Sequence, residues 1–180
     1  MNKELLALEY ARTAHSSINQ KRKYTNDEYI VHPINVAYLV KLFGGTEEMI
    51  CASYLHDVIE DVYPKNNKYS VFDIEKTFGS KILELVLWLT DESKKSDGNR
   101  NARKEIDRNK YKHAPKSAKM IKIADLIDNS LTIFEHDKNF SKIYLKEKEL
   151  LLPILYDDSH IDIYHLANKI LLKHKEKNND

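Results

Sequence analysis

Cysteine, glycine and proline are all scarce in this chain of 180 residues, and each shortage excludes a class of structure. A single cysteine, Cys51, rules out a disulfide within the chain, and its place in an apolar helical run predicts a packed thiol. That usage fits a reducing cytoplasm. With only four glycines, four prolines and almost no strand-like alternation, the sequence does not favour a β-rich fold.

Long apolar runs are missing as well. No stretch of about 18 apolar residues occurs, and the short apolar stretch at the N-terminus carries Glu4 and Glu9. We therefore expect no signal peptide, no membrane span and no membrane partner, and a cytoplasmic location. The net charge of only +1 excludes a globally polybasic protein, so nucleic acid is not an expected partner, and nothing in the sequence predicts an oligomeric state.

Apolar residues recur three and four positions apart along most of the chain, which predicts an all-α bundle with short connections. We expect a single domain over residues 1–172 and a polar, frayed tail over 173–180. Residues 80–90 are apolar almost all round, so they predict a central, buried helix. The other expected helices cover residues 5–19, 32–43, 46–61, 70–78, 115–131, 141–155 and 159–173, with Pro153 bending or ending the one that contains it.

The end of the helix expected over 46–61 carries four side chains suited to metal binding or proton transfer. On a continuous α-helix His56 and Glu60 are four residues apart, and so are Asp57 and Asp61. The four groups would then lie on two adjacent stripes of one surface. A histidine and an aspartate sharing a cation, beside two further carboxylates that reach a bound water, are the groups that a metal-assisted hydrolase requires.

The His-Asp dipeptide alone is a weak signal, because a second one occurs at His136-Asp137. Support comes from His32, which opens a helix with Pro33, and from Asp125, which interrupts the apolar face of another. His32, His56, Asp57 and Asp125 together make a two-histidine, two-aspartate set without thiolate. Such a set suits Mn, Fe, Co or Zn.

Positive charge is concentrated in residues 94–122, where eleven lysines and arginines stand against three acids, for a net +8. A basic surface of this kind attracts an anionic partner, although a solvated lysine-rich face is an equally good interpretation.

Several ordered motifs resemble the HD-domain phosphohydrolases, and within them the RelA/SpoT-type (p)ppGpp hydrolases, especially the small stand-alone alarmone hydrolases. The resemblance covers roughly residues 11–155. The motifs are Tyr29-Ile-Val-His-Pro33 with Val36-Ala37, Ala52-Ser-Tyr-Leu-His-Asp-Val-Ile-Glu-Asp61, Phe78-Gly79, Leu89-Thr90, and Ile121-Lys-Ile-Ala-Asp125 with Asn129.

The resemblance implies an Mn2+-dependent hydrolase that removes the 3′-pyrophosphate of (p)ppGpp and gives GDP or GTP and pyrophosphate. It implies one divalent ion per chain on His32, His56, Asp57 and Asp125. Glu60 and Asp61 would orient or activate the hydrolytic water. The resemblance and the basic segment together also imply contacts with the nucleotide polyphosphate substrate. The expected contact residues are Arg22, Lys23, Asn129, Lys94, Lys95, Tyr111, Lys112 and Lys119.

Two departures from the family pattern leave other substrates open. Residues 25–28 replace the usual loop before Tyr29, and Leu126 and Leu131 stand where the family often has basic residues. The alternatives are a phosphatase for a related phosphorylated nucleotide, such as NADPH, and a non-catalytic nucleotide sensor on the same scaffold. Intact metal ligands beside Glu60 and Asp61 favour catalysis over sensing.

Overall fold

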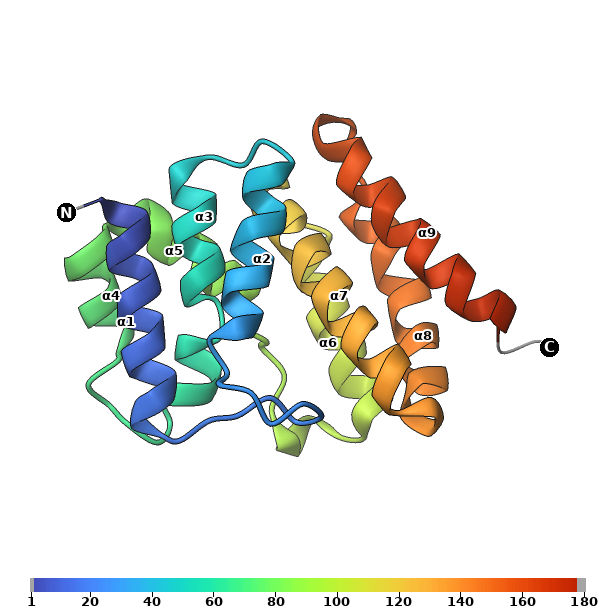
Figure 1. The fold of residues 1–180 in the computed structure, drawn as a ribbon, viewed down its shortest axis with the longest axis horizontal. Coiled ribbons are helices and arrows are strands. Elements are labelled where there is room, and N and C mark those ends of the chain that lie inside the picture. The colour runs from blue at the N-terminus through green and yellow to red at the C-terminus, as the bar shows by residue number, and fades with distance from the viewer. Residues whose placement is uncertain (1, 178–180) are drawn as a thin grey trace. The chain divides into compact units, whose positions relative to one another are not determined.

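The computed structural model describes residues 2–177, which form helices and connecting loops (Figure 1). No β-strand occurs in that range, where an isolated bridge between Lys21 and Glu28 closes a loop. The predicted all-α fold is confirmed. The chain groups into two compact units, residues 1–90 and 91–180, and the expected single domain over 1–172 stays a prediction. None of the described helices has the length and apolar character needed to cross a bilayer.

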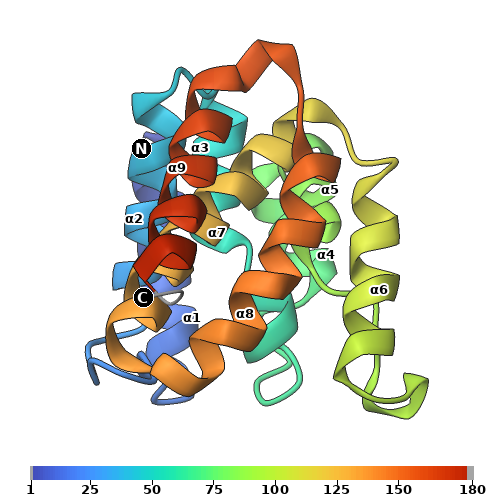
Figure 2. The same ribbon diagram turned by 90° about the vertical axis from the view of Figure 1, so that its right-hand side faces the viewer.

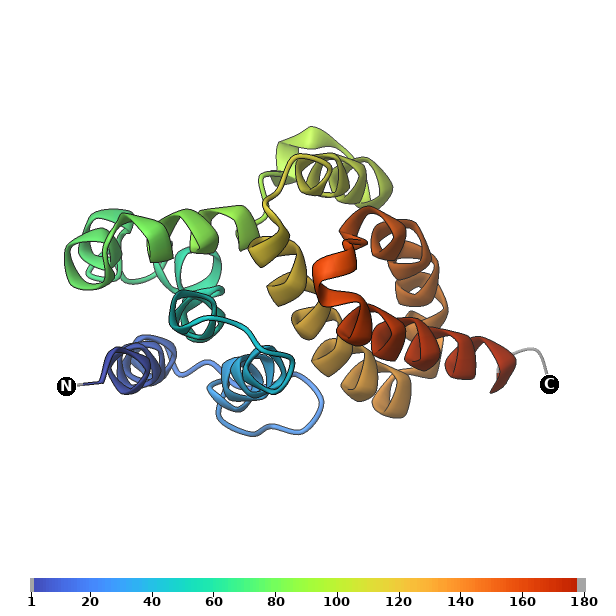
Figure 3. The same ribbon diagram turned by 90° about the horizontal axis from the view of Figure 1, so that it is seen from above.

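The first unit is organised around helix α3 (Glu47–Leu55), which packs against three other helices. Figure 3 shows α3 between the pair α1 and α2 on one side and α5 on the other. Three alanines of α1 are fully buried, and their small side chains let α1 approach α3 closely. The remaining elements of this unit are α1 (Lys3–Ser17), α2 (Val31–Leu42), the π-helix η1 (Val58–Val62), α4 (Val71–Phe78) and α5 (Ser80–Leu89).

The turn between α2 and α3 depends on two glycines. Gly44 adopts a φ of 82°, in the left-handed region. A side chain on Gly45 would meet Val40 Cγ1 at 2.3 Å, so the turn has no room for one.

Cys51 is fully buried in α3, and burial raises the pKa of its thiol to about 12. The predicted packed cysteine is thus confirmed.

The second unit is built around α7 (Lys116–His136), against which α8 and α9 pack (Figure 2). Its core joins the buried face of α7 to Ile163, Ala167 and Leu171 of α9. The other elements of this unit are η2 (Lys95–Asp97), α6 (Arg100–Tyr111), α8 (Lys138–Leu151), η3 (Leu152–Leu155), η4 (Asp158–His160) and α9 (Ile161–Lys177).

Most helix ends lie where the sequence predicted them. The Ser70 hydroxyl accepts a hydrogen bond from the Asp73 backbone amide at 3.1 Å and caps the start of α4, and Gly79 caps its end. Pro115 precedes α7, and α8 stops just before Pro153. This is expected because proline has no backbone N–H with which to continue the hydrogen bonds of an α-helix.

Three expectations about the helices were wrong. The helix expected over 46–61 ends at Leu55, and the chain turns into the π-helix η1. Helix α6 lies in the basic segment, where none was predicted, because few apolar residues mark its inner face. Helix α9 runs to Lys177, so residues 173–177 of the expected frayed tail are helical, and residues 178–180 lie outside the described range.

Candidate metal centre

His32, His56 and Asp57 bring their side chains together in the first unit. His32 is the second residue of α2, directly before Pro33 in the first turn of that helix, and His56 caps the C-terminus of α3. Both imidazoles are buried, at 1% and 2% exposure, while Asp57 is partly buried at the junction with η1. Two helix ends that meet in the packed core therefore place three metal-binding groups at one point.

The spacing of the three ligand atoms matches the first coordination sphere of one divalent ion. His32 Nε2 lies 3.2 Å from His56 Nε2. Asp57 Oδ2 lies 3.1 Å from His56 Nε2 and 3.7 Å from His32 Nε2. Ligands about 2.1 Å from a metal are about 3.0 Å apart at right angles and about 3.4 Å apart in a tetrahedron. The three groups therefore fit a cation, and all three ligand atoms lie within 4.8 Å of one another.

Hydrogen bonds behind the ligands orient them. His56 Nδ1 donates to the Ser53 carbonyl at 2.8 Å, so Nε2 keeps its lone pair for a metal. The Tyr29 hydroxyl donates to Asp57 Oδ2 at 2.6 Å, which fixes the carboxylate. Outer partners of this kind hold the tautomer and the direction of a metal ligand, so the set is pre-arranged.

Glu60 and Asp61 lie on the π-helix next to this cluster. The Tyr63 amide bonds to the Val58 carbonyl five residues back, which makes this segment a π-helix, while the Asp61 amide bonds to the Asp57 carbonyl four residues back at 2.9 Å and so keeps the expected spacing of those two acids. Glu60 is exposed, whereas Asp61 is partly buried and accepts a hydrogen bond from Gln20 Nε2 at 2.7 Å. Burial and then the neighbouring Asp57 carboxylate raise the pKa of Asp61, which favours a carboxylate that can take up a proton.

The predicted fourth ligand, Asp125, belongs to the second unit. On α7 its carboxylate pairs with Lys122 Nζ at 2.8 Å and accepts from Asn129 Nδ2 at 2.6 Å. Asp125 and Asn129, four residues apart on α7, are thus joined by a hydrogen bond. Burial opposes a charge on Lys122, but the Asp125 carboxylate raises the pKa of that lysine. Ligation by Asp125 stays a prediction.

Two of the expected substrate contacts, Arg22 and Lys23, lie in the loop before α2. The Arg22 amide bonds to the Asp27 carbonyl at 2.9 Å, and the Asn26 amide bonds to the Arg22 carbonyl at 3.1 Å, which closes the loop into a tight turn. Lys23 Nζ donates to the Tyr24 hydroxyl at 3.0 Å. The altered loop is therefore an ordered turn that holds both basic residues.

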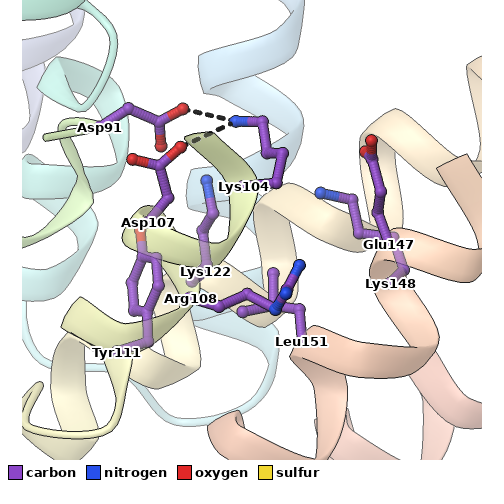
Figure 4. A pocket seen from close by; sticks show the side chains of 9 residues that line it. All are labelled: Asp91, Lys104, Asp107, Arg108, Tyr111, Lys122, Glu147, Lys148 and Leu151. Atoms are coloured by element: carbon purple, nitrogen blue, oxygen red, sulfur yellow. Dashed lines mark hydrogen bonds and ion pairs between the residues drawn. The ribbon is translucent and has the colours of Figure 1, made fainter. Parts of the chain in front are cut away.

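The other expected substrate contacts are in the second unit. Lys94, Lys95 and Lys112 are exposed and Lys119 is partly buried, whereas the Tyr111 ring is buried at 2%. Tyr111 lines a pocket in which Lys104 bonds to the carboxylates of Asp91 and Asp107 (Figure 4). Four of the cations in residues 94–122 pair with acids that lie outside that range. The pairs are Lys104 with Asp91, Lys110 with Glu92, Lys122 with Asp125, and Arg100 with Glu147. The basic surface is therefore weaker than the count of +8 suggests.

Lys148 lines the same pocket and provides a test of its electrostatics. Burial and the nearby Lys122 lower the pKa of Lys148 to about 8, from 10.5. Between pH 8 and 10.5 Lys148 is neutral in the folded protein but still protonated in the unfolded chain. The charged, buried lysine therefore lowers the free energy of unfolding at neutral pH, and this cost disappears as the pH rises through that range. We expect Lys148→Met to raise the free energy of unfolding at pH 7 by about 1–3 kcal/mol.

The gain from Lys148→Met should shrink as the pH rises from about 8 to 10.5 and vanish above that range, where both states of the wild type carry a neutral lysine. Urea unfolding of the wild type and of Lys148→Met at pH 7 and pH 10 measures this gain in the free energy of unfolding. The matched control is Lys146→Met, at an exposed position of the same helix. An equal gain at both pH values would contradict the electrostatic origin of the effect.

The family model for the HD domain matches residues 7–143, which is more than half of the chain. The chain belongs to the HD domain family. Among solved structures, the HD domain described here resembles that of a metazoan ortholog of SpoT that hydrolyzes ppGpp, with a TM-score of 0.83, 24% identity and 96% of each chain covered. That likeness confirms the predicted fold.

Curated relatives of this HD domain are named as guanosine-3′,5′-bis(diphosphate) 3′-pyrophosphohydrolases. The protein of Aquifex aeolicus is 31% identical over 169 residues, which are 91% of this chain and 22% of that relative. The protein MESH1 of Xenopus tropicalis is 30% identical over 128 residues, which are 69% of this chain and 67% of that relative. The chain thus spans about a fifth of the first relative and two thirds of the second.

Sequence reasoning missed three residues that support the site in this HD domain. Tyr29 opens the Tyr-Ile-Val-His-Pro motif, and its place three residues before His32 was the available signal. Gln20 reaches Asp61 and bonds to His15 Nδ1 at 2.8 Å. Neither His15 nor Gln20 stands in a pattern that marks it, because both reach the site through tertiary packing.

Proposed function

We propose that this HD domain is a metal-dependent phosphohydrolase that removes the 3′-pyrophosphate of ppGpp and pppGpp. The observation that carries the proposal is the cluster of His32, His56 and Asp57, whose ligand atoms lie at the spacing of a single divalent ion. The relatives named as 3′-pyrophosphohydrolases support the choice of substrate. The products are GDP or GTP and pyrophosphate.

The proposed cofactor is one Mn2+ per chain, with Fe, Co or Zn as other ions that such a ligand set accepts. His32 and His56 would bind it through Nε2 and Asp57 through its carboxylate. Asp125 remains the expected fourth ligand on the strength of the sequence. When bound, the ion lowers the pKa of a water and neutralises charge on the phosphoryl group.

The side chains around the cluster would supply the proton transfer. Asp61 is held by Gln20 and has a raised pKa, so it suits the group that takes a proton from the attacking water. Glu60, exposed on the same π-helix, is the second acid able to orient that water. Water would add to the phosphorus atom that is bonded to the ribose O3′. The bond between that phosphorus and O3′ would then break, and O3′ would receive a proton.

Substrate contacts are assigned by charge and position. Arg22 and Lys23, on the tight turn before α2, are proposed to hold the guanine base or its phosphates. Asn129 is proposed as a pocket residue on α7, beside Asp125. In the second unit, the proposed phosphate or ribose contacts are Lys94, Lys95, Tyr111, Lys112 and Lys119, of which the exposed lysines attract polyphosphates over about a Debye length.

Incubation of the Mn2+-loaded protein with ppGpp, pppGpp, NADPH and ordinary nucleotides, followed by identification of the products, tests this function. We expect GDP and pyrophosphate from ppGpp, GTP and pyrophosphate from pppGpp, and no turnover of GDP or ATP. Asp57→Ala prepared in the same way is the control for contaminating phosphatases. Release of single phosphate from NADPH alone would replace the proposed activity, and tight binding of ppGpp without turnover would indicate a sensor.

A further inference from the structure

Three side chains from separate segments of the first unit form a hydrogen-bonded chain that ends at Asp61. Gln20, in the loop after α1, lies in the middle: its Nε2 donates to Asp61 Oδ2 at 2.7 Å, and its Oε1 lies 2.8 Å from His15 Nδ1. An amide oxygen only accepts hydrogen bonds, so the proton between His15 and Gln20 belongs to His15 Nδ1.

The surroundings of His15 keep the proton on that nitrogen. The imidazole is buried at 1% exposure on α1, and its Nε2 has no hydrogen-bond partner within the described part of the chain. No acceptor therefore draws the proton to Nε2. Burial also lowers the pKa of His15, so the ring is neutral with a single N–H group, on Nδ1.

A His15 that donates through Nδ1 allows only one orientation of the Gln20 amide. In the reversed orientation the amide oxygen would face the Asp61 carboxylate, and the amide N–H would face the N–H of His15. Both contacts are repulsive. His15 thus turns the N–H of Gln20 towards Asp61 and fixes the direction of that carboxylate.

We propose that His15 is a positioning residue for Asp61 and acts through Gln20. The inference rests on the proposed function, in which Asp61 handles the hydrolytic water. The same histidine ring packs against the Tyr29 ring, with centroids 4.6 Å apart, and the Tyr29 hydroxyl donates to Asp57. His15 therefore supports from one side both the metal-binding cluster and the acid next to it.

Kinetics of four variants test the proposal. Loss of an outer partner typically costs about 10–100-fold, so we expect His15→Leu to lower kcat by about 10-fold with KM little changed. His15→Asn, whose side-chain N–H can replace Nδ1–H, should recover most of the activity. Gln20→Leu should match His15→Leu, and the double variant should be no worse than either single variant, because both break one chain.

The matched control is His160→Leu, a buried histidine in the second unit whose Nε2 lies 3.2 Å from the Leu155 carbonyl oxygen. It should lower thermal stability without changing kcat. Nitrogen-15 NMR of the metal-free protein provides a readout independent of activity, in which His15 should carry its proton on Nδ1.

Three results would overturn the inference: a proton on His15 Nε2, losses that multiply in the double variant, or an equal loss of kcat in His160→Leu. Failure of the proposed function has a different signature, because the wild-type protein would then not hydrolyse ppGpp. In that case the NMR measurement still decides whether His15 orients Gln20 towards Asp61.

Discussion

Asp57→Ala should leave the protein without bound metal and without measurable hydrolysis. Asp57 is the only carboxylate in the described three-residue cluster, and its removal leaves two imidazoles, which carry no negative charge to offset that of a divalent ion. Changes even to outer partners of a metal ligand cost about 10–100-fold in affinity or activity, so the loss of a ligand should exceed about 100-fold.

Elemental analysis and thermal unfolding with and without Mn2+ measure this effect. The wild-type protein should contain about one ion per chain and gain stability with added Mn2+, by about 2.7 kcal/mol when the ion is at 100 times its Kd. Asp57→Ala should show neither, while Asp162→Ala, an exposed aspartate on α9, should behave as wild type. Asp125→Ala puts the predicted fourth ligand to the same measurement. A native protein that holds no metal and is not stabilised by Mn2+ would exclude the site.

The second large effect should come from the acids on the π-helix. Asp61→Asn should lower kcat by about 10²–10⁴-fold while leaving metal content near normal, because a water-handling group is worth about that much and Asp61 is not among the three clustered ligands. Glu60→Gln should lower kcat less, since Glu60 is exposed whereas Asp61 is held by Gln20.

Steady-state kinetics at saturating ppGpp, together with metal analysis, separate these roles. Glu9→Gln, an exposed acid on α1, is the matched control for a lost carboxylate. Full activity in both Glu60→Gln and Asp61→Asn would show that the water is activated by another group. Loss of metal from Asp61→Asn would instead make that residue a ligand.

Local sequence signals were sufficient for most of the helices and for the central part of the site. Ser70, Gly79 and Pro153 act on the backbone within a few residues, so their effects can be read without the fold. His32 and the His56-Asp57 pair were recognisable for a similar reason. Each stands at a helix end, where a polar side chain next to an apolar run requires an explanation.

Residues 46–61 show where local signals stop being sufficient. The sequence by itself determined that this run is helical, apolar and ended by acids, because those properties depend on spacing along the chain. Only the tertiary structure decided that α3 gives way to a π-helix after His56, where Val58 and Val62 are both buried and η1 packs against α1. The same packing brought His15 and Gln20 to Asp61, since hydrogen bonds between distant segments form only when the core places them within about 3 Å.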